Sequence, residues 1–506
     1  MFVRRKRNAS GSFSVQIIRK VGRINKVVKT LGSSSDEREL DTLERQARLE
    51  IDRLQGQATI FSREKDESLT SMLSTISNNE IELVGPDKIL GHVYESIGYE
   101  RIGIDELFKE LVISRLVYPG SKLKTIDYLA RYKNKEISVY SIYRYMDKIH
   151  KEFKEKVEEI TFEHFKDVLG GRIGVVFYDM TTLYFETPDE DDLRKIGYSK
   201  DGKHQHPQIK LGLLVGPEGY PLGYDIFEGN IYEGYTLIPF LESIEKKFLI
   251  GKPIVIADAG LLSNSNIQAL IDHGYKFVLG GKIRNENREI KEAIQQLEIA
   301  EDKPREVNKG GNRLIISFSK KRQKKDEYNR KKGLEKLEKK VKNGKLDKNS
   351  INNRGYNKYL KLESEVKVAI DYRKYEMDAK WDGLKGYLTN TDMNPNEVIG
   401  AYGDLWQIEK AFRISKTDIR VRPIYHRIPK RIRTHICICF VSYAVFKELE
   451  RLLKIKKVAF SANRAVELTK NMYQIRVFLP ESKTYTTVPL KPTDEQQELI
   501  SAIMKI

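Results

Sequence analysis

Three acidic residues, far apart in the chain, are the strongest candidates for chemistry. Asp179 lies in the apolar stretch RIGVVFYDMTTLYFE and is followed by Thr181 and Thr182, whereas Asp258 ends the apolar run IVIAD. A buried carboxylate is costly without a partner. Carboxylates that converge at strand ends can share two hard divalent cations about 3.5 to 4 Å apart, which is the arrangement that phosphodiester chemistry needs. Taken singly, each aspartate could instead be a cap or a turn residue.

The third candidate, Glu409, lies in the segment VIGAYGDLWQIEKAFRISK, which predicts one helix. Its apolar residues form one stripe: Leu405, Ile408 and Phe412. Residues at spacings of four, three, four and three share another face: Tyr402, Trp406, Glu409, Arg413 and Lys416. The pattern predicts that Glu409 holds metal while Arg413 and Lys416 contact DNA phosphates. The alternative is an ordinary amphipathic helix in which Glu409 pairs with Arg413.

The elements around the two aspartates indicate an α/β fold. β-Branched and aromatic residues predict three successive antiparallel strands at residues 172–186, 209–215 and 221–229. Helices and short strands then alternate over residues 236–281. This order describes a ribonuclease-H-like core, a mixed sheet flanked by helices. In such a sheet the strands that carry Asp179 and Asp258 are neighbours.

Length and composition allow several domains and a polyanionic partner. The 506 residues suggest roughly three or four structural units. Hydrophobic residues make up 40% and charged residues 32%, as in a soluble globular protein. The formal net charge of +18 favours a nucleic acid as partner. A merely solubilising basic surface is the alternative.

Cysteine usage and hydropathy indicate a compartment. Cys437 and Cys439 are the only cysteines, which excludes a disulfide framework and a zinc site built from cysteines. Both are predicted to be small buried residues on a core element in a reducing compartment. The N-terminal segment has no apolar run of signal-peptide length, and no segment reaches a membrane-spanning run of about 18 apolar residues. We therefore expect a cytoplasmic protein without membrane contact.

Residues 1–60 predict a basic DNA-binding module, because no acidic residue occurs from residue 1 to 35. The segment SFSVQIIRKVGRINKVVKTLG predicts two short strands about a Gly-containing turn, and TLERQARLEIDRL predicts a helix. The candidate DNA contacts are Arg4, Arg5, Arg7, Arg19, Lys20 and Arg23. A ribbon or a helix could lie in a groove. The alternative is a basic tail with no fixed partner.

The remaining regions are less specific. Residues 61–165 predict a helical DNA-binding or dimerisation region, although packing alone would explain their apolar stripes. The ribonuclease-H-like core is predicted in two parts, 166–284 and 376–450, and the second part carries Glu409. Between them, residues 285–375 predict a lysine-dense insertion, which is either a second DNA-clamping surface or a solvated helical hairpin. Residues 451–506 form a C-terminal region.

Basic residues crowd the stretch that follows Glu409: Arg420, Arg422, Arg427, Lys430, Arg431 and Arg433. A DNA strand end or a terminal repeat is the natural partner of this stretch. The candidate contacts are Arg422, His426, Arg431 and Arg433. His426 could contact the region of the scissile phosphate, although a lone histidine is more often structural.

Together these motifs resemble the bacterial insertion-sequence DDE transposases of the "insertion sequence four" group. The signature of that group is Tyr, two residues, Arg, three residues, Glu, six residues, Lys, and Tyr402, Glu409 and Lys416 match its spacing. Leu405 stands where the signature has Arg, so that one phosphate contact is missing or supplied elsewhere. YDMTT resembles the first-Asp motif, and the long interval between Asp258 and Glu409 is similar to that of members with a strand-rich insertion. The resemblance covers roughly residues 170 to 450.

The resemblance implies a metal-dependent DNA recombination enzyme. Asp179, Asp258 and Glu409 would hold two Mg²⁺ or Mn²⁺ ions that promote cleavage at the ends of a mobile element. The freed 3′ hydroxyl would then attack target DNA, in cut-and-paste movement through a hairpin intermediate. Double-stranded terminal inverted repeats and target DNA would be the partners, with a homodimer in the synaptic complex. The resemblance implies a place at the nucleoid of the bacterial cytoplasm.

Two other functions remain open. A metal-dependent nuclease or resolvase on the same fold would cut DNA without joining it. A domesticated DNA-binding protein would bind without catalysis, and the presence of all three acids argues against it.

Overall fold

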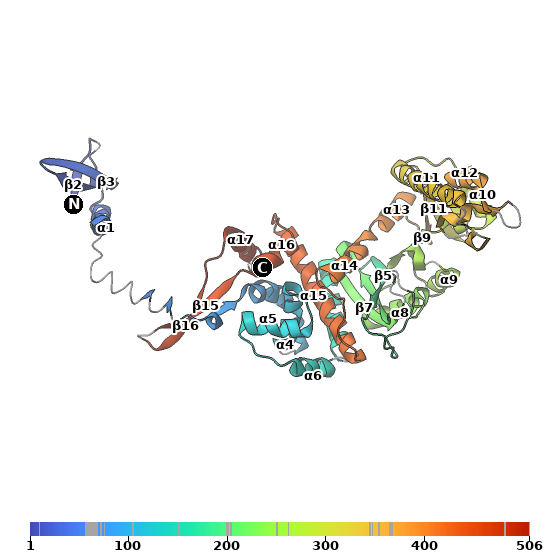
Figure 1. Ribbon diagram of the computed structural model, residues 1–506, viewed down its shortest axis with the longest axis horizontal. Coiled ribbons are helices and arrows are strands. Elements are labelled where there is room, and N and C mark those ends of the chain that lie inside the picture. Colours follow the sequence, from blue (N-terminus) through green and yellow to red (C-terminus); the bar gives the residue numbers. More distant parts are fainter. Residues whose placement is uncertain are drawn as a thin grey trace. The chain divides into compact units, whose positions relative to one another are not determined.

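The computed structural model describes the chain apart from short segments. The residues outside the description are 10, 56–68, 71–72, 75, 104–105, 150–151, 199–201, 203–204, 249–250, 262, 344–345, 347, 353–354, 364–367, 480–481 and 505–506. The chain divides into two compact units, Met1–Glu82 with Tyr473–Lys491 and Leu83–Met472 with Pro492–Ile506. Figure 1 labels their elements. The predicted domain boundary at residue 60 lies outside the described residues.

The N-terminal segment forms a three-stranded antiparallel sheet in the order β1-β2-β3, followed by a helix. Its elements are β1 (Phe2–Arg7), β2 (Phe13–Val21), β3 (Ile24–Ser34) and α1 (Glu37–Gln55). The predicted hairpin and helix are confirmed as β2, β3 and α1. The basic run at residues 2–7 was not predicted to be a strand. It is one because Val3 contacts the apolar cluster under α1 and Arg5 pairs with acids of that helix.

The first unit also contains a second three-stranded sheet, in the order β16-β15-β4. It joins β4 (Ile81–Leu83) to β15 (Tyr473–Leu479) and β16 (Thr484–Pro489), which lie near the two ends of the sequence. β4 departs from the helical character predicted for residues 61–165. The C-terminal region predicted at 451–506 is therefore shared between the two units.

Helices form the first part of the second unit. They are α3 (His92–Ile97), α4 (Glu106–Val117), α5 (Lys122–Lys133), α6 (Val139–Ile149) and α7 (Glu152–Val168). Most side chains of α4 are buried, and α4, α6 and α7 all contact the long helix α15 (Pro429–Ile455). α15 carries Cys437 and Cys439, whose predicted burial is confirmed. Every described helix is too short or too polar to cross a lipid bilayer.

An eight-stranded mixed sheet forms the centre of the second unit (Figure 1). Its strands are β5 (Val175–Tyr184), β6 (Gln208–Val215), β7 (Pro221–Glu228), β8 (Ile254–Ala257), β9 (Phe277–Gly281), β10 (Arg305–Lys309), β11 (Asn312–Phe318) and β14 (Leu384–Thr389). Their order is β10-β11-β14-β9-β8-β5-β6-β7. β5, β8 and β9 are parallel, and the other pairs are antiparallel. The strands predicted between residues 172 and 281 are confirmed.

Helices cover both faces of this sheet. The Tyr178 ring of β5 lies 5.3 Å from that of Phe240 on α8 (Leu237–Phe248), which places α8 on one face. On the other face Tyr224 of β7 contacts Phe440 of α15 with ring centres 4.7 Å apart. Further helices of this unit are α9 (Asn264–Asp272), α16 (Ala462–Thr469) and α17 (Asp494–Met504). The predicted α/β class, a mixed sheet flanked by helices, is confirmed.

The predicted insertion at residues 285–375 is partly built into the sheet. β10 and β11 extend the sheet beyond β14, so they are not a separate domain. The other elements are α10 (Arg288–Gln296), α11 (Lys320–Lys342), β12 (Leu360–Leu362), β13 (Val368–Ile370) and α12 (Tyr372–Ala379). Leu337, Tyr359 and Leu360 belong to a small apolar core of their own. In the insertion, β10 and β11 therefore extend the central sheet, whereas α11 packs on a separate apolar core.

The segment predicted to be one helix around Glu409 is two helices. α13 (Pro395–Gly403) has Asp404 as its C-cap, and α14 (Trp406–Thr417) begins after Leu405. α13 starts with a capping box between Asn394 and Glu397. Gly400 and Gly403 weaken its last turn, because glycine costs about 1 kcal/mol in a helix interior. The break lies between Tyr402 and Glu409, so these two residues belong to different helices.

Candidate active site between the central sheet and α14

Asp179 lies on β5, and Asp258 directly follows the neighbouring strand β8. The parallel register of β5 and β8 pairs Phe177 with Ile256 and Tyr178 with Ala257. Asp179 is the next residue of β5, and Asp258 directly follows the end of β8. Neighbouring strands lie about 4.8 Å apart. The predicted adjacency of the two strands is therefore confirmed.

Asp179 lies on the face of the sheet that α14 and α15 cover. Tyr178 points to the opposite face, where its hydroxyl hydrogen-bonds with that of Thr236 at 2.9 Å. Successive strand side chains alternate between faces. Leu213, directly opposite Asp179 on β6, lines an apolar pocket together with residues of α14 and α15. The carboxylate of Asp179 is thereby directed towards α14.

Glu409 lies on α14, which contacts β5. Ile408 and Phe412 hold this helix in the core, whereas Glu409 is exposed. Within the described part of the chain, Glu409 has no hydrogen bond or ion pair, and so does not pair with Arg413. The intrahelical pair that was the alternative role for Glu409 is absent from this structure.

Asp258 is hydrogen-bonded by a tyrosine of α13, the helix that precedes α14. The hydroxyl of Tyr402, at the end of α13, donates a hydrogen bond of 2.9 Å to Oδ1 of Asp258. Burial raises the pKa of Tyr402, and the charges of Asp258 and Glu409 raise it further. The phenol therefore stays protonated at neutral pH and remains a donor. This hydrogen bond holds the carboxylate of Asp258 in one orientation.

Lys385 of β14 is a member of this site that the sequence motifs did not reveal. Its Nζ lies 4.3 Å from the centre of the Tyr402 ring. Burial, together with Arg322, lowers the pKa of Lys385, while the charges of Asp258 and Glu409 raise it. The ammonium group thus lies in the electrostatic field of both acids. Among the described residues, Tyr402 and Lys385 link Asp258 electrostatically to Glu409.

The donor set fits a divalent cation, although the three acids do not form a closed cluster. No group of three or more His, Cys, Asp or Glu side chains in the described residues is arranged to hold a metal ion. Mg²⁺ and Mn²⁺ prefer carboxylate oxygens, which all three side chains provide. Like charges repel and keep neighbouring carboxylates apart. Bound cations would offset this repulsion and allow the three carboxylates to converge.

The basic and aromatic residues predicted near Glu409 differ in accessibility. Trp406 is 54% exposed, and Arg413 and Arg433 are exposed as well, so all three are accessible to DNA. Lys416 is partly buried. The guanidinium of Arg422 lies 5.7 Å from the ring centre of Tyr184 on β5. Two further positions of the proposed signature, Tyr402 and Leu405, are buried.

Arg431 and His426 occupy structural positions. Arg431 at the start of α15 forms two hydrogen bonds of 2.8 and 2.7 Å with the carboxylate of Asp147 on α6. His426 is 8% exposed, and its ring contacts those of Tyr143 and His435. Burial, and then nearby cations, lower the pKa of His426 to about 3, so its ring is neutral. Both side chains stabilise the segment that joins α14 to α15.

The six N-terminal candidates also divide into two groups. Arg5 pairs with Glu37, Asp41 and Glu44 of α1. Arg4 donates a hydrogen bond of 3.0 Å to Gln16. The remaining candidates are exposed: Arg7, Arg19, Lys20 and Arg23. The structure therefore commits Arg5 to holding α1 on the sheet.

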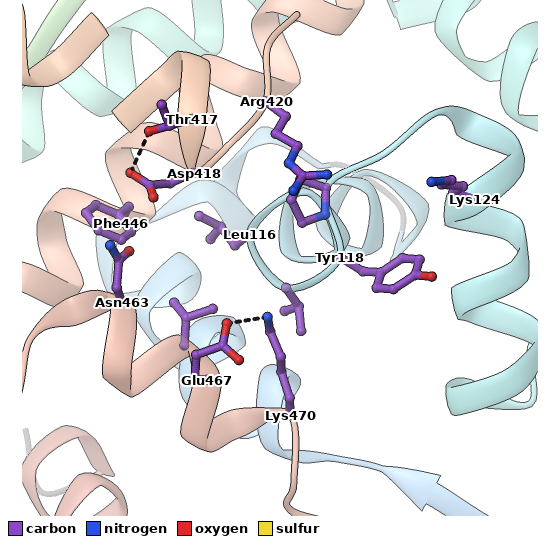
Figure 2. A pocket seen from close by; sticks show the side chains of 13 residues that line it. Leu116, Tyr118, Lys124, Thr417, Asp418, Arg420, Phe446, Asn463, Glu467 and Lys470 are labelled. Atoms are coloured by element: carbon purple, nitrogen blue, oxygen red, sulfur yellow. Dashed lines mark hydrogen bonds and ion pairs between the residues drawn. The ribbon is translucent and has the colours of Figure 1, made fainter. Parts of the chain in front are cut away.

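A pocket of 520 Å³ lies at the other end of α14, away from the acids (Figure 2). Its lining comes from α4, α5, α15, α16 and the segment after α14. Figure 2 shows Glu467 paired with Lys470, and Asp418 beside Thr417 at 3.3 Å. Glu467 and Lys470 thus offset each other's charge at this pocket. None of the three candidate acids lines it.

Residues 170–445, more than half of the chain, match the family model described as "Transposase DDE domain". The chain belongs to this transposase family. No curated protein sequence matches it. The DDE transposase is also similar to a solved chain described as "piggyBac transposase synaptic complex with hairpin DNA", with a TM-score of 0.39, 10% identity and 76% of each chain covered.

The matched region of this DDE transposase contains the whole candidate site. Asp179, Asp258, Lys385, Tyr402 and Glu409 all lie within residues 170–445. The N-terminal sheet and α1 lie outside it. Family membership therefore supports DNA cleavage and strand transfer as the activity of the matched region.

Proposed function

We propose that this chain catalyses cut-and-paste DNA transposition, with Asp179, Asp258 and Glu409 as its catalytic acids. They would hold two Mg²⁺ or Mn²⁺ ions. When bound, such ions lower the pKa of a coordinated water and stabilise the departing 3′ oxygen of a phosphodiester. The substrates would be double-stranded element ends and target DNA. Because two ends must meet, the active species would be a homodimer, acting at the bacterial nucleoid.

The parallel register between β5 and β8 carries this proposal. In this register Asp179 of β5 lies beside the C-terminal end of β8, which Asp258 directly follows, on a sheet that α14 contacts. Glu409 is exposed and has no partner among the described side chains, so its carboxylate is available as a ligand. The strand order β7-β6-β5-β8-β9 has the pattern expected for a ribonuclease-H-like core. The spacing of Tyr402, Glu409 and Lys416 supports the "insertion sequence four" group.

The neighbouring side chains would position substrate and acids. Tyr402 fixes the orientation of Asp258 through its hydroxyl. Arg413 is exposed one turn after Glu409, so its guanidinium can bind a phosphate of the DNA strand with two parallel hydrogen bonds. Preorganised cations of this kind stabilise charge that develops in the transition state. Arg413 would thus replace the signature arginine, whose place is taken by the buried Leu405.

A cleavage assay tests the proposal. Purified full-length chain is incubated with a duplex that contains the element end, with Mg²⁺, Mn²⁺ or EDTA. We expect cleavage with either metal and none with EDTA. Asp179→Asn and Asp258→Asn should each abolish it. Equal cleavage by these variants and the unchanged protein would refute the proposal.

We expect the ammonium group of Lys385 to bind a DNA phosphate, so Lys385→Met should slow single-turnover cleavage about 10- to 100-fold. A charge-assisted hydrogen bond of this kind contributes roughly 1.5 to 3 kcal/mol. Lys385→Arg keeps the cation and should restore most of the rate. Lys361→Met removes an exposed lysine from β12 and serves as the control. If Lys385 only supported packing, Met would retain the rate, because its apolar chain is close in length to that of Lys.

A further inference from the structure

The hairpin of β2 and β3 extends past the end of β1, the remaining strand of the N-terminal sheet. Pairing of β1 with β2 ends at Phe2 and Ile18, whereas β2 and β3 remain paired from Arg19 with Lys26 to Val21 with Ile24. A two-residue turn of Gly22 and Arg23 closes the hairpin. Gly22 has φ 63°, which suits the first position of a type II′ turn. Residues 19–26 thus form a two-stranded ribbon, referred to below as the basic ribbon.

The basic ribbon is exposed along its whole length. Every residue from 19 to 26 is exposed. Its cations are Arg19, Lys20, Arg23 and Lys26, and the ribbon contains no acid. Among the described residues, none of these four side chains is in an ion pair. Val21 and Ile24 at the tip are 51% and 66% exposed. The ribbon therefore offers uncompensated positive charge around an apolar tip.

The helix of the same module has the opposite character. Glu37, Asp41 and Glu44 of α1 surround Arg5, and Glu50 of α1 pairs with Lys29 of β3 at 2.8 Å. The cations that face α1 are thereby neutralised inside the module. α1 contains six acidic and four basic residues, so a polyanion that approaches the module meets net positive charge on the basic ribbon and net negative charge on α1.

The dimensions of the basic ribbon fit duplex DNA. Its strands are about 4.8 Å apart and its three residue pairs span roughly 10 Å. The major groove of B-DNA is about 12 Å wide and admits a two-stranded ribbon. Cross-strand neighbours share a face, so Arg19 and Lys26 lie on one face and Lys20 and Asn25 on the other. Cations on both faces can reach the phosphates on both sides of a groove, and Asn25 can read a base edge.

We propose that the basic ribbon enters the major groove of double-stranded DNA and that α1 does not contact the DNA. This proposal rests on the proposed function insofar as the bound duplex is an element end. It resolves which part of the N-terminal module binds, because the sequence left both a ribbon and a helix possible. It also assigns Lys26 and Asn25 to the contact surface and removes Arg5 from it.

Binding of the full-length chain to a fluorescent 40-base-pair duplex tests this surface. Lys20→Gln with Arg23→Gln is compared with Arg45→Gln and Arg48→Gln, which remove the same charge from exposed positions of α1. Two lost phosphate contacts should lower the slope of log K against log salt by about 1.8. The α1 pair should bind like the unchanged protein. Equal weakening by the two pairs would overturn the proposal. Circular dichroism confirms that both variants are folded.

The groove and the type of nucleic acid are tested with the same protein. Methylation with dimethyl sulfate marks guanine N7 in the major groove and adenine N3 in the minor groove, and we expect interference at guanine N7. Interference at adenine N3 alone, or tighter binding of a 40-nucleotide single-stranded RNA than of the duplex, would overturn the proposal. A chain that binds through the ribbon but never cleaves would contradict the proposed function and leave the ribbon proposal intact.

Discussion

Replacing Glu409 with Gln is expected to lower metal-dependent cleavage of an element-end duplex by about 1,000-fold or more. The amide keeps the size of the side chain and its place on α14, but it is a poor ligand for a hard cation. Loss of one ligand forfeits several kcal/mol of charge stabilisation in the transition state, and each 1.36 kcal/mol is tenfold in rate. Glu409 is exposed and has no partner among the described residues, so the change should leave the fold intact.

Asp404→Asn is the matched control for Glu409→Gln. Asp404 is an exposed acid at the end of α13, five positions before Glu409, and the site proposed here does not use it. This variant should cleave at close to the unchanged rate. Both variants should bind the duplex with unchanged affinity. If Glu409→Gln cleaved like Asp404→Asn, the third acid of the site would lie elsewhere.

A precut duplex that ends in a 3′ hydroxyl is expected to be joined to target DNA by the unchanged protein with Mg²⁺ or Mn²⁺. The same catalytic acids would serve cleavage and joining, so Asp258→Asn should give no joined product. A nuclease with the same fold would hydrolyse the intact duplex but would not join the precut duplex to target DNA. The assay therefore separates the two activities that a set of acids on this fold can support.

The strand-transfer assay has an internal control in the DNA. A precut duplex that ends in a 3′-deoxy nucleotide binds in the same way but lacks the nucleophile. It should yield no joined product with the unchanged protein. Joining of this blocked end would point to a different reaction. Cleavage of the intact duplex without any joining of the 3′-hydroxyl end would make the protein a nuclease.

Local sequence patterns were sufficient to predict the central strands. β5 is rich in β-branched and aromatic residues, and β8 is a short apolar run that ends at Asp258. Such strands are specified by burial on both faces, which local composition reveals. The adjacency of Asp179 and Asp258 followed from the order of strands and helices. Glu409 was found through its helix and its resemblance to a known signature.

The contributions that the sequence did not reveal depend on distant partners. Lys385 lies in an unremarkable strand, and only the pairing of β14 with β9 brings it to Tyr402. Arg431 lies in a basic stretch that suggested DNA contact, yet Asp147, far away in the chain, pairs with it. The break at Asp404 was missed because the apolar spacing continues across it. Hydrophobic periodicity reports the buried face of an element, and not the partners of its polar side chains.

The anomalous diffraction of Mn²⁺ in crystals of the full-length chain with a precut duplex tests most directly whether Asp179, Asp258 and Glu409 share two metal ions. We expect two peaks about 3.5 to 4 Å apart, with carboxylate oxygens of Asp179, Asp258 and Glu409 at roughly 2.0 to 2.3 Å from the metal. We also expect both peaks to be lost in Asp258→Asn crystals. Peaks bound by other residues, or a Glu409 side chain that stays away from both ions in the DNA complex, would contradict the proposed site.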